Sequence, residues 1–100
     1  MPNYIPPTKD IIFVLQDVLD VQNNDIPGYK DLETNFVSSI LNESGKLAQN
    51  VLAPLNATGD ADGCHLENGI VRTPKGFKSA FEQIKAGGWP SLDCDPKYGG

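Results

Sequence analysis

The chain has few of the residues that build catalytic or metal-binding sites. Its 100 residues include one histidine, His65, and two cysteines, Cys64 and Cys94, and their positions match no zinc-binding spacing. Clustered cations are missing too, because the 8 Lys and Arg are scattered along a chain of formal net charge -5. Nucleic-acid binding is therefore not expected, since it depends on clustered cations that displace counterions.

Long apolar runs are also missing. The longest, Ile11 to Leu15, has five residues, whereas a membrane-spanning helix needs about 20. The N-terminus carries prolines and lacks the charged-then-apolar order of a secretion signal. We therefore expect a soluble cytoplasmic protein, in which Cys64 and Cys94 stay reduced rather than forming a disulfide.

Length and composition set the scale of the fold. A chain of 100 residues makes one domain at most and buries roughly 65% of its unfolded surface, so its core is small. The apolar fraction of 39%, with 10 Gly and 8 Pro, suits short helices joined by ordered loops. The patterns below predict an all-α fold of about three helices with one short β-hairpin.

A first helix is predicted over residues 9–21, after a proline-containing extended lead-in at residues 1–7. Thr8 is its expected N-cap. Seven apolar residues fill one half of its surface: Ile11, Ile12, Val14, Leu15, Val18, Leu19 and Val21. A buried strand at residues 11–15 is the alternative, because Ile and Val are β-branched, but the length of the pattern favours the helix.

The longest predicted helix starts at Thr34 or Asn35 and ends near Asn56, after a loop at residues 22–34. Leu47 and Val51 lie at the centre of its apolar arc. Ser44 lies inside that arc, where its hydroxyl is expected to bond a carbonyl one turn back. Pro54 is expected to kink the last turn, because it lacks an N–H.

The second half of the chain is predicted to hold a hairpin and a third helix. Residues 58–63 are rich in turn-forming residues, and Asn68-Gly69 is the strongest two-residue signal for a hairpin, here over residues 66–73. Thr73 is the expected cap of a helix with Pro74 at its first position. Four residues form its apolar stripe: Phe77, Ala80, Phe81 and Ile84. The helix ends at Ala86, before Gly87-Gly88, and an irregular tail follows.

One segment partly matches a calcium-binding loop. Thr58-x-Asp60-x-Asp62-Gly63 has the alternating carboxylates, but Thr58 and Gly69 occupy the positions at which the pattern requires an acid and a Glu. A solvated turn is therefore the favoured interpretation over a calcium site.

The remaining chemistry-bearing residues are isolated. His65 has no nucleophile motif beside it, which favours a polar residue at a hairpin edge over a catalytic group. Asp93 and Asp95 are flanked by turn-forming residues, which favours turn formation over acid–base chemistry. The sequence predicts no catalytic, cofactor-binding or metal-binding residue in this chain.

Two aromatic residues lie outside the predicted apolar faces. Phe13 falls on the charged side of the first helix, and Trp89 follows the third helix. Large apolar groups in such positions often belong to an interface, although single exposed aromatics also occur on ordinary monomers. We expect Phe13 to contribute to a docking surface.

The order of short motifs resembles the N-terminal part of acyl-CoA dehydrogenases. The similar segments are Lys46-Leu47-Ala48-Gln49-Asn50-Val51-Leu52-Ala53-Pro54-Leu55-Asn56, Gly59-Asp60, Gly63-Cys64, Arg72-Thr73-Pro74-Lys75-Gly76-Phe77-Lys78, Gly87-Gly88-Trp89-Pro90-Ser91-Leu92 and Asp95-Pro96-Lys97-Tyr98-Gly99-Gly100. Tyr4-Ile5-Pro6-Pro7 and Asp10-Ile11-Ile12-Phe13-Val14-Leu15 resemble the N-terminal extension of the larger bacterial branch. The resemblance covers essentially the whole chain.

This resemblance implies a structural role in a flavoenzyme. Residues 1–34 would be the extension helix and loop, and residues 35–100 the helix, hairpin, helix and tail of the N-terminal helical domain. In that family FAD accepts a hydride from the acyl-CoA, and a glutamate removes the α-proton. The base, the flavin-binding segments and most of the substrate cavity lie further along the chain, so the 100 residues alone would be inactive. The alternative is a free-standing helical module that binds a protein partner through Phe13.

Overall fold

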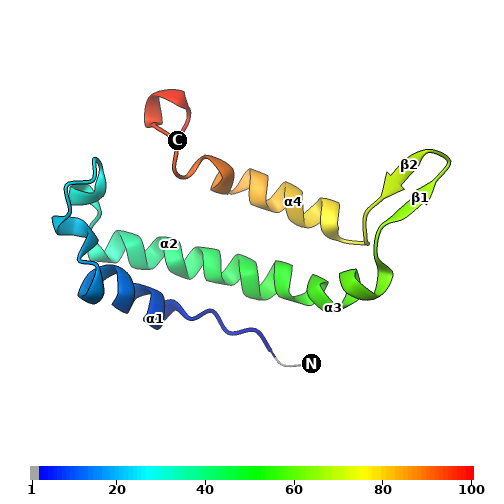
Figure 1. Ribbon diagram of the computed structural model, residues 1–100, viewed down its shortest axis with the longest axis horizontal. Coiled ribbons are helices and arrows are strands. Elements are labelled where there is room, and N and C mark those ends of the chain that lie inside the picture. Colours follow the sequence, from blue (N-terminus) through cyan, green and yellow to red (C-terminus); the bar gives the residue numbers. More distant parts are fainter. Residues whose placement is uncertain (1–2) are drawn as a thin grey trace. The chain divides into compact units, whose positions relative to one another are not determined.

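The computed structural model describes residues 3–100 and shows three helical stretches and a hairpin within them (Figure 1). The first stretch is α1 (Thr8–Phe13) with the π-helical η1 (Val14–Val18), and the second is α2 (Thr34–Leu47), the π-helical η4 (Ala48–Leu52) and α3 (Ala53–Asp62). The strands β1 (His65–Glu67) and β2 (Ile70–Arg72) and then α4 (Phe77–Ala86) follow. The predicted fold, mostly helical with one hairpin, is confirmed.

The chain forms two compact units, Met1–Asn50 and Val51–Gly100. Short 3₁₀ turns complete them: η2 (Val21–Asn23) and η3 (Tyr29–Asp31) in the first unit, η5 (Trp89–Ser91) and η6 (Pro96–Tyr98) in the second.

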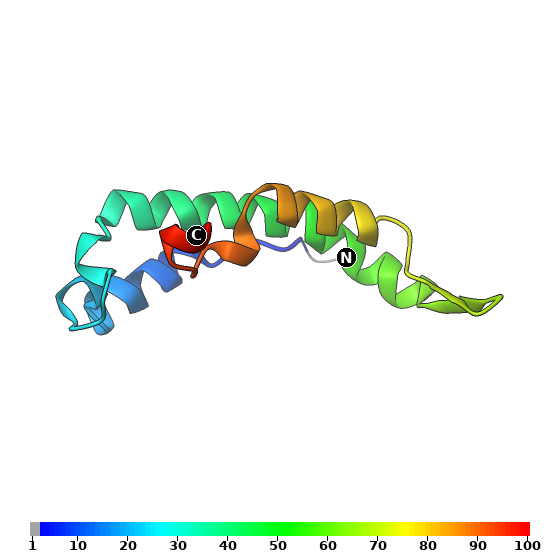
Figure 2. The same cartoon turned by 90° about the horizontal axis from the view of Figure 1, so that it is seen from above.

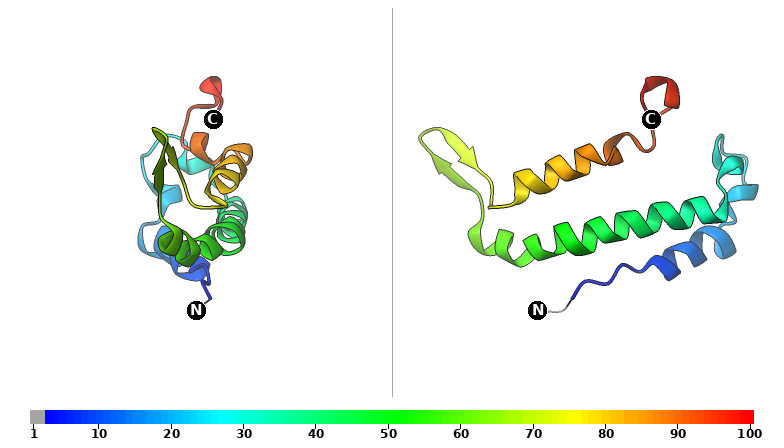
Figure 3. Two further views of the ribbon diagram at one scale, coloured as in Figure 1. Left: turned by 90° about the vertical axis from the view of Figure 1, so that its right-hand side faces the viewer. Right: turned by 180° about the vertical axis from the view of Figure 1, so that it is seen from behind.

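In the first unit, α1 packs against α2, and the lead-in runs beside α2 as well (Figure 3, right). A side chain at Gly45 of α2 would place its Cβ 3.1 Å from Pro6, so glycine permits this close approach. Thr8 is the first residue of α1 and not its cap, which corrects the prediction. Pro7 holds the cap position without a side-chain hydrogen bond, and the Thr8 amide donates to the Pro6 carbonyl at 2.8 Å.

The first helix ends at Val18, three residues before the predicted end at Val21. Its last turn is π-helical, with the Leu19 amide donating to the Val14 carbonyl at 2.8 Å. Asp20 then adopts a left-handed conformation, with φ of 47°, which interrupts the helix. Val21 lies in η2 and is only 8% exposed. The apolar pattern therefore predicted the burial of Val21 correctly and its place in the first helix wrongly, because Val21 begins the separate 3₁₀ turn η2.

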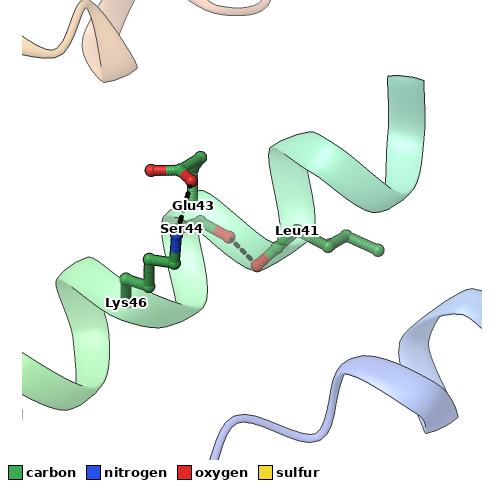
Figure 4. A network of polar contacts seen from close by, with 4 residues as sticks. All are labelled: Leu41, Glu43, Ser44 and Lys46. Atoms are coloured by element: carbon green, nitrogen blue, oxygen red, sulfur yellow. Dashed lines mark hydrogen bonds and ion pairs between the residues drawn. The ribbon is translucent and has the colours of Figure 1, made fainter. Parts of the chain in front are cut away.

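The long helix begins at Thr34, as predicted. Two side-chain interactions link residues three positions apart within α2 (Figure 4). The Ser44 hydroxyl donates to the Leu41 carbonyl at 3.0 Å, which confirms the prediction for this serine. On the neighbouring exposed positions, Lys46 Nζ lies 2.9 Å from Glu43 Oε1.

Helical structure continues past Pro54 to Asp62, so the predicted end near Asn56 and the loop at residues 58–63 are both wrong. A proline within an α-helix removes one N–H and clashes with the carbonyl four residues earlier. The preceding residues, η4, are π-helical, and Pro54 falls in the first turn of the new helix α3. Proline is tolerated there because the first N–H groups of a helix have no intrahelical acceptor.

The hairpin forms where Asn68-Gly69 predicted it. β1 and β2 are antiparallel, with Leu66 opposite Val71, and they extend beyond α3 (Figures 1 and 2). Asn68 and Gly69 have φ of 52° and 77°, and two positive φ angles are what a type I′ turn requires.

The last helix, α4, starts at Phe77 and not at Pro74, so Thr73 is not its cap. The cause is Gly76, whose φ of 92° is incompatible with a helix beginning any earlier. The predicted end is correct, because α4 stops at Ala86. The Gly87 and Gly88 amides then donate to the Gln83 and Lys85 carbonyls at 3.1 Å each.

Among the described residues, neither unit fully buries a large side chain. Among residues 3–100 the buried hydrophobic residues are Val21 and Ala80, while Leu47 and Val51, the predicted core centre, are only half-buried. The accessible surface is 7889 Å². Even two separate compact bodies of about 50 residues each would together expose only about 6,700 Å². Apolar faces on both units are therefore left uncovered.

Two glycines at opposite ends of α4 give a matched test of backbone strain. Gly76 and Gly88 both have positive φ, of 92° and 76°. A Cβ on Gly76 would lie 2.8 Å from Leu55 Cδ2, whereas one on Gly88 would meet nothing within 4 Å. We expect Gly88→Ala to lower the free energy of unfolding by about 1 kcal/mol through strain alone. Gly76→Ala should cost about 1 kcal/mol more, through the added clash. Equal urea midpoints for the two variants would contradict the role of Leu55.

Candidate docking surfaces

The residues considered for catalysis, His65, Asp93 and Asp95, all belong to the second unit. His65 Nε2 lies 3.1 Å from Asp62 Oδ1, and both side chains are about half exposed. Asp60 and Asp62 belong to the last turn of α3, so the segment that partly matches a calcium loop is helical rather than a turn. Within residues 3–100 no group of three or more His, Cys, Asp or Glu is arranged to hold a metal ion.

The two cysteines and the C-terminal acids take local roles. Cys64 and Cys94 are free and exposed. Asp95 Oδ1 accepts a hydrogen bond from the Lys97 amide at 3.0 Å and caps η6, which confirms turn formation for this residue. None of the helices in the described part of the chain combines the length and apolar character needed to cross a membrane.

The first unit contains an apolar groove of about 230 Å³. The start of η1, the loop with η2 and η3, and the first half of α2 supply its walls. Its lining residues are Leu15, Val21, Tyr29, Leu32, Val37, Ile40 and Leu41. These residues are separated in the sequence, and they become neighbours because the loop folds back over α2. The side-chain amide of Gln22 donates to the Leu32 carbonyl and fastens this loop.

Acidic residues surround that groove in the sequence, and all of them are exposed. They are Asp17, Asp20, Asp25, Asp31 and Glu33, against a single cation, Lys30, between residues 15 and 41. Lys30 Nζ lies 3.8 Å from Asp25 Oδ1, on the surface. We call this feature the acid-rimmed groove. Asp20, Asp31 and Glu33 are each next to a lining residue in the sequence, whereas the lining residues themselves include no acid.

Gln16 places an unsatisfied polar atom in the same unit. Its side-chain nitrogen is buried and has no hydrogen-bond partner among the residues described. Gln16 is outside the seven residues predicted to form the apolar half of the first helix, so the pattern placed it on the solvent-facing half. Its burial, beside half-buried Ile12 and Leu15, shows which side of this helix faces inward.

The second unit has its own apolar groove, of about 290 Å³, between η4–α3 and α4. Its lining residues are Leu52, Leu55, Asn56, Phe77, Ala80, Phe81 and Ile84. All four residues of the predicted apolar stripe of the third helix are among them. Phe81 is nevertheless 57% exposed, and Lys85 Nζ lies 5.8 Å from the centre of its ring.

Phe13 is 55% exposed, as the sequence predicted, but it is not isolated. Val14 and Val18, which were predicted on the covered half of the helix, are exposed as well. The inward side of this helix is therefore rotated relative to the prediction, and Phe13, Val14 and Val18 form what we call the Phe13 surface. Trp89 is half-buried, and a Cβ on Gly87 would lie 2.8 Å from its Nε1, so this ring folds back on the end of α4.

Two valines of the first unit test whether the floor of the acid-rimmed groove stabilises it. Val21 lines the groove and is 8% exposed, whereas Val18 is 60% exposed. We expect Val21→Ala to lower the free energy of unfolding by about 1–2 kcal/mol, because two buried methyl groups are lost. Val18→Ala should change it by less than about 0.5 kcal/mol. Thermal melts of both variants decide the point, and similar midpoints would show that the groove floor contributes no stability.

No known family model matches the sequence. The chain is 34% identical over 98 residues to 3-methylmercaptopropionyl-CoA dehydrogenase of Ruegeria pomeroyi. The match covers 97% of this chain but only 17% of that relative. The resemblance to acyl-CoA dehydrogenases that the motifs indicated is therefore confirmed.

Proposed function

We propose that these residues form the N-terminal structural domain of an FAD-dependent acyl-CoA dehydrogenase, an enzyme that introduces an α,β double bond into an acyl-CoA thioester. One observation carries the proposal: the match to 3-methylmercaptopropionyl-CoA dehydrogenase, at 34% identity, extends along 97% of the chain and is not confined to one motif. The chain spans 17% of that relative. The catalytic base and the flavin-binding segments would lie in the remainder of the enzyme.

The uncovered apolar surface supports a role within a larger assembly. Both units leave large apolar side chains exposed, among them Phe13 and Phe81. Each 100 Å² of apolar surface removed from water is worth about 2.5 kcal/mol, so covering these faces would stabilise the domain considerably. The Phe13 surface is our candidate for contact with the remainder of the parent enzyme or with its second subunit.

In this proposal the redox chemistry and the structural role belong to different parts of the enzyme. Bound flavin supplies the redox step, while the protein orients the thioester and excludes water. We assign this chain to the second task, as a helical wall, and assign no catalytic, flavin-binding or metal-binding residue to it. The parent enzyme would act in the bacterial cytoplasm and would pass its electrons to a separate acceptor.

A free-standing helical protein-interaction module is the second candidate. The exposed apolar residues of both units favour it as well, because such patches also occur on adaptor proteins. The two candidates differ in the size and cofactor of the native polypeptide.

The native polypeptide therefore provides the test. Since 98 matched residues are 17% of the relative, a full enzyme of this kind has about 580 residues. An antibody against this chain should recover a polypeptide of about that size, carrying flavin and reducing a dye when an acyl-CoA thioester is added. Recovery of a flavin-free protein of 100 residues would instead support the interaction module.

The isolated chain should be inert towards the cofactor. We expect the purified 100-residue chain, mixed with FAD, to leave the absorbance and fluorescence of the flavin unchanged, because the segments that hold flavin would lie elsewhere in the enzyme. A chain denatured in urea is the control for nonspecific quenching. A stoichiometric yellow complex would contradict the division of labour proposed above.

A further inference from the structure

We propose that Asn68, at the tip of the hairpin, is a site of spontaneous deamidation whose rate is set by the native turn. Asn68 and Gly69 are exposed and join β1 to β2. The product is aspartate or isoaspartate at residue 68. The reaction takes place within two neighbouring residues and needs no partner surface, so this inference does not depend on the flavoenzyme assignment.

Asn68 is the asparagine with the least hindered neighbour. The chain has eight asparagines, and Asn68 is the one that glycine follows. Deamidation begins when the backbone nitrogen of the next residue attacks the side-chain amide, and a side chain on that residue crowds the attack. Gly69 has no Cβ, and a Cβ built there would meet nothing within 4 Å. Asn42, Asn50 and Asn56, by contrast, lie in the helical backbone of α2, η4 and α3.

The reaction consumes one water molecule and releases ammonia. The Gly69 nitrogen bonds to Cγ of Asn68 and gives its proton to solvent, while the Cγ–Nδ2 bond breaks and Nδ2 takes up a proton and leaves as ammonia. Water then opens the resulting succinimide ring at one of its two carbonyls. Cleavage at Cγ leaves aspartate in a normal main chain, and cleavage at the main-chain carbonyl leaves isoaspartate, in which Cγ carries the link to Gly69. No atom changes its oxidation state overall.

The native turn opposes ring closure. The succinimide requires Cβ of Asn68 and the Gly69 nitrogen to be nearly eclipsed about the Cα–C bond of Asn68. Asn68 has φ of 52°, and a type I′ turn sets ψ of its first central residue to about 30°, which places the two atoms nearly opposite one another. Glu67 and Ile70 pair on either side of the turn and maintain this conformation. The ring therefore forms from molecules whose turn has come apart.

Little holds the turn together. Both strands are exposed along their three residues, and a two-stranded hairpin is marginally stable in water. Arg72 Nε lies 2.9 Å from Glu67 Oε2, but this ion pair is on the surface, where such pairs contribute little. We therefore expect Asn68 to be the first asparagine of the chain to convert.

The two products differ in their effect on the hairpin. Isoaspartate adds one carbon to the main chain of the loop, and the length of a hairpin loop fixes its register. Glu67 and Ile70 can then no longer pair across a two-residue turn. Aspartate keeps the loop length, and Asp-Gly also favours a type I′ turn. Aspartate thus changes only the charge, whereas isoaspartate locks the hairpin open.

A removable cross-link tests the protection by the turn. Leu66 and Val71 are opposite one another, and such residues have Cα atoms about 4.5–5.5 Å apart, within the range of a disulfide. The variant Leu66→Cys/Val71→Cys, which also carries Cys64→Ser and Cys94→Ser, is incubated in warm neutral buffer, oxidised or reduced. Peptide mapping follows the loss of asparagine at residue 68. The oxidised chain should convert at least about tenfold more slowly than the same chain reduced.

A charge-matched control separates the new main-chain linkage from the new charge. Asn68→Asp carries the charge of the product, releases no ammonia from residue 68, and should keep the cross-strand contacts between Leu66 and Val71 in NMR spectra. Wild-type chain that has aged to isoaspartate, isolated by chromatography, should lose these contacts. Circular dichroism should show that both forms keep their helices.

The outcomes that contradict the proposal are specific. If another asparagine of the wild-type chain converts as fast as Asn68, the site is wrong. If the oxidised and reduced chains convert at equal rates, the turn does not protect Asn68. If the isoaspartate form keeps the contacts between Leu66 and Val71, the product does not lock the hairpin open.

Discussion

In the described part of the chain, neither unit fully buries a large side chain. The exposed apolar grooves and surfaces of the molecule follow from this limited hydrophobic core. Val21 and Ala80 are the buried hydrophobic residues in the described part of the chain, and each is small or medium in size. Each unit has one apolar seam: α1 packs against α2 in the first, and residues of η4–α3 and α4 line a shared groove in the second. Their remaining apolar surface faces outward, which is why the grooves and the Phe13 surface exist.

Two π-helical turns adapt these helices to their sequence. A π turn inserts one extra residue and shifts the register of every side chain that follows it. After η4, Pro54 begins a new helical turn in a place where its missing N–H costs nothing. In η1 the same device ends the first helix and lets Val21 turn inward from the following loop. Both turns therefore set which residues line the neighbouring groove.

Local patterns in the sequence were sufficient for some elements and not for others. Asn68-Gly69 specified the hairpin because the turn chemistry is contained in two residues, and Ser44 behaved as expected because its partner lies within one turn. The helix end predicted near Asn56 was wrong because the effect of Pro54 depends on the register of the preceding helical turns. The apolar periodicity of the sequence does not report that register. The caps at Thr8 and Thr73 failed because Pro7 and Gly76 fix the adjacent backbone.

The grooves could not be predicted from the sequence for a different reason. Leu15, Val21 and Leu32 become neighbours only after the loop folds back over α2, and no short spacing encodes that return. Phe13 was identified because a single misplaced apolar residue is visible in a helical pattern. Phe81 was not, because it matched the predicted stripe while remaining exposed.

The hairpin has a consequence for the dynamics of the chain. Its two strands are three residues long, all six residues are exposed, and a pair of strands without a covering layer is marginally stable in water. Its amide hydrogens should therefore exchange with solvent through local opening, long before the whole chain unfolds. An exposed tip such as Asn68-Gly69 is also the kind of site at which proteases first cut a folded chain. Hydrogen exchange and limited proteolysis should thus report the separate opening of this hairpin while the helices remain folded.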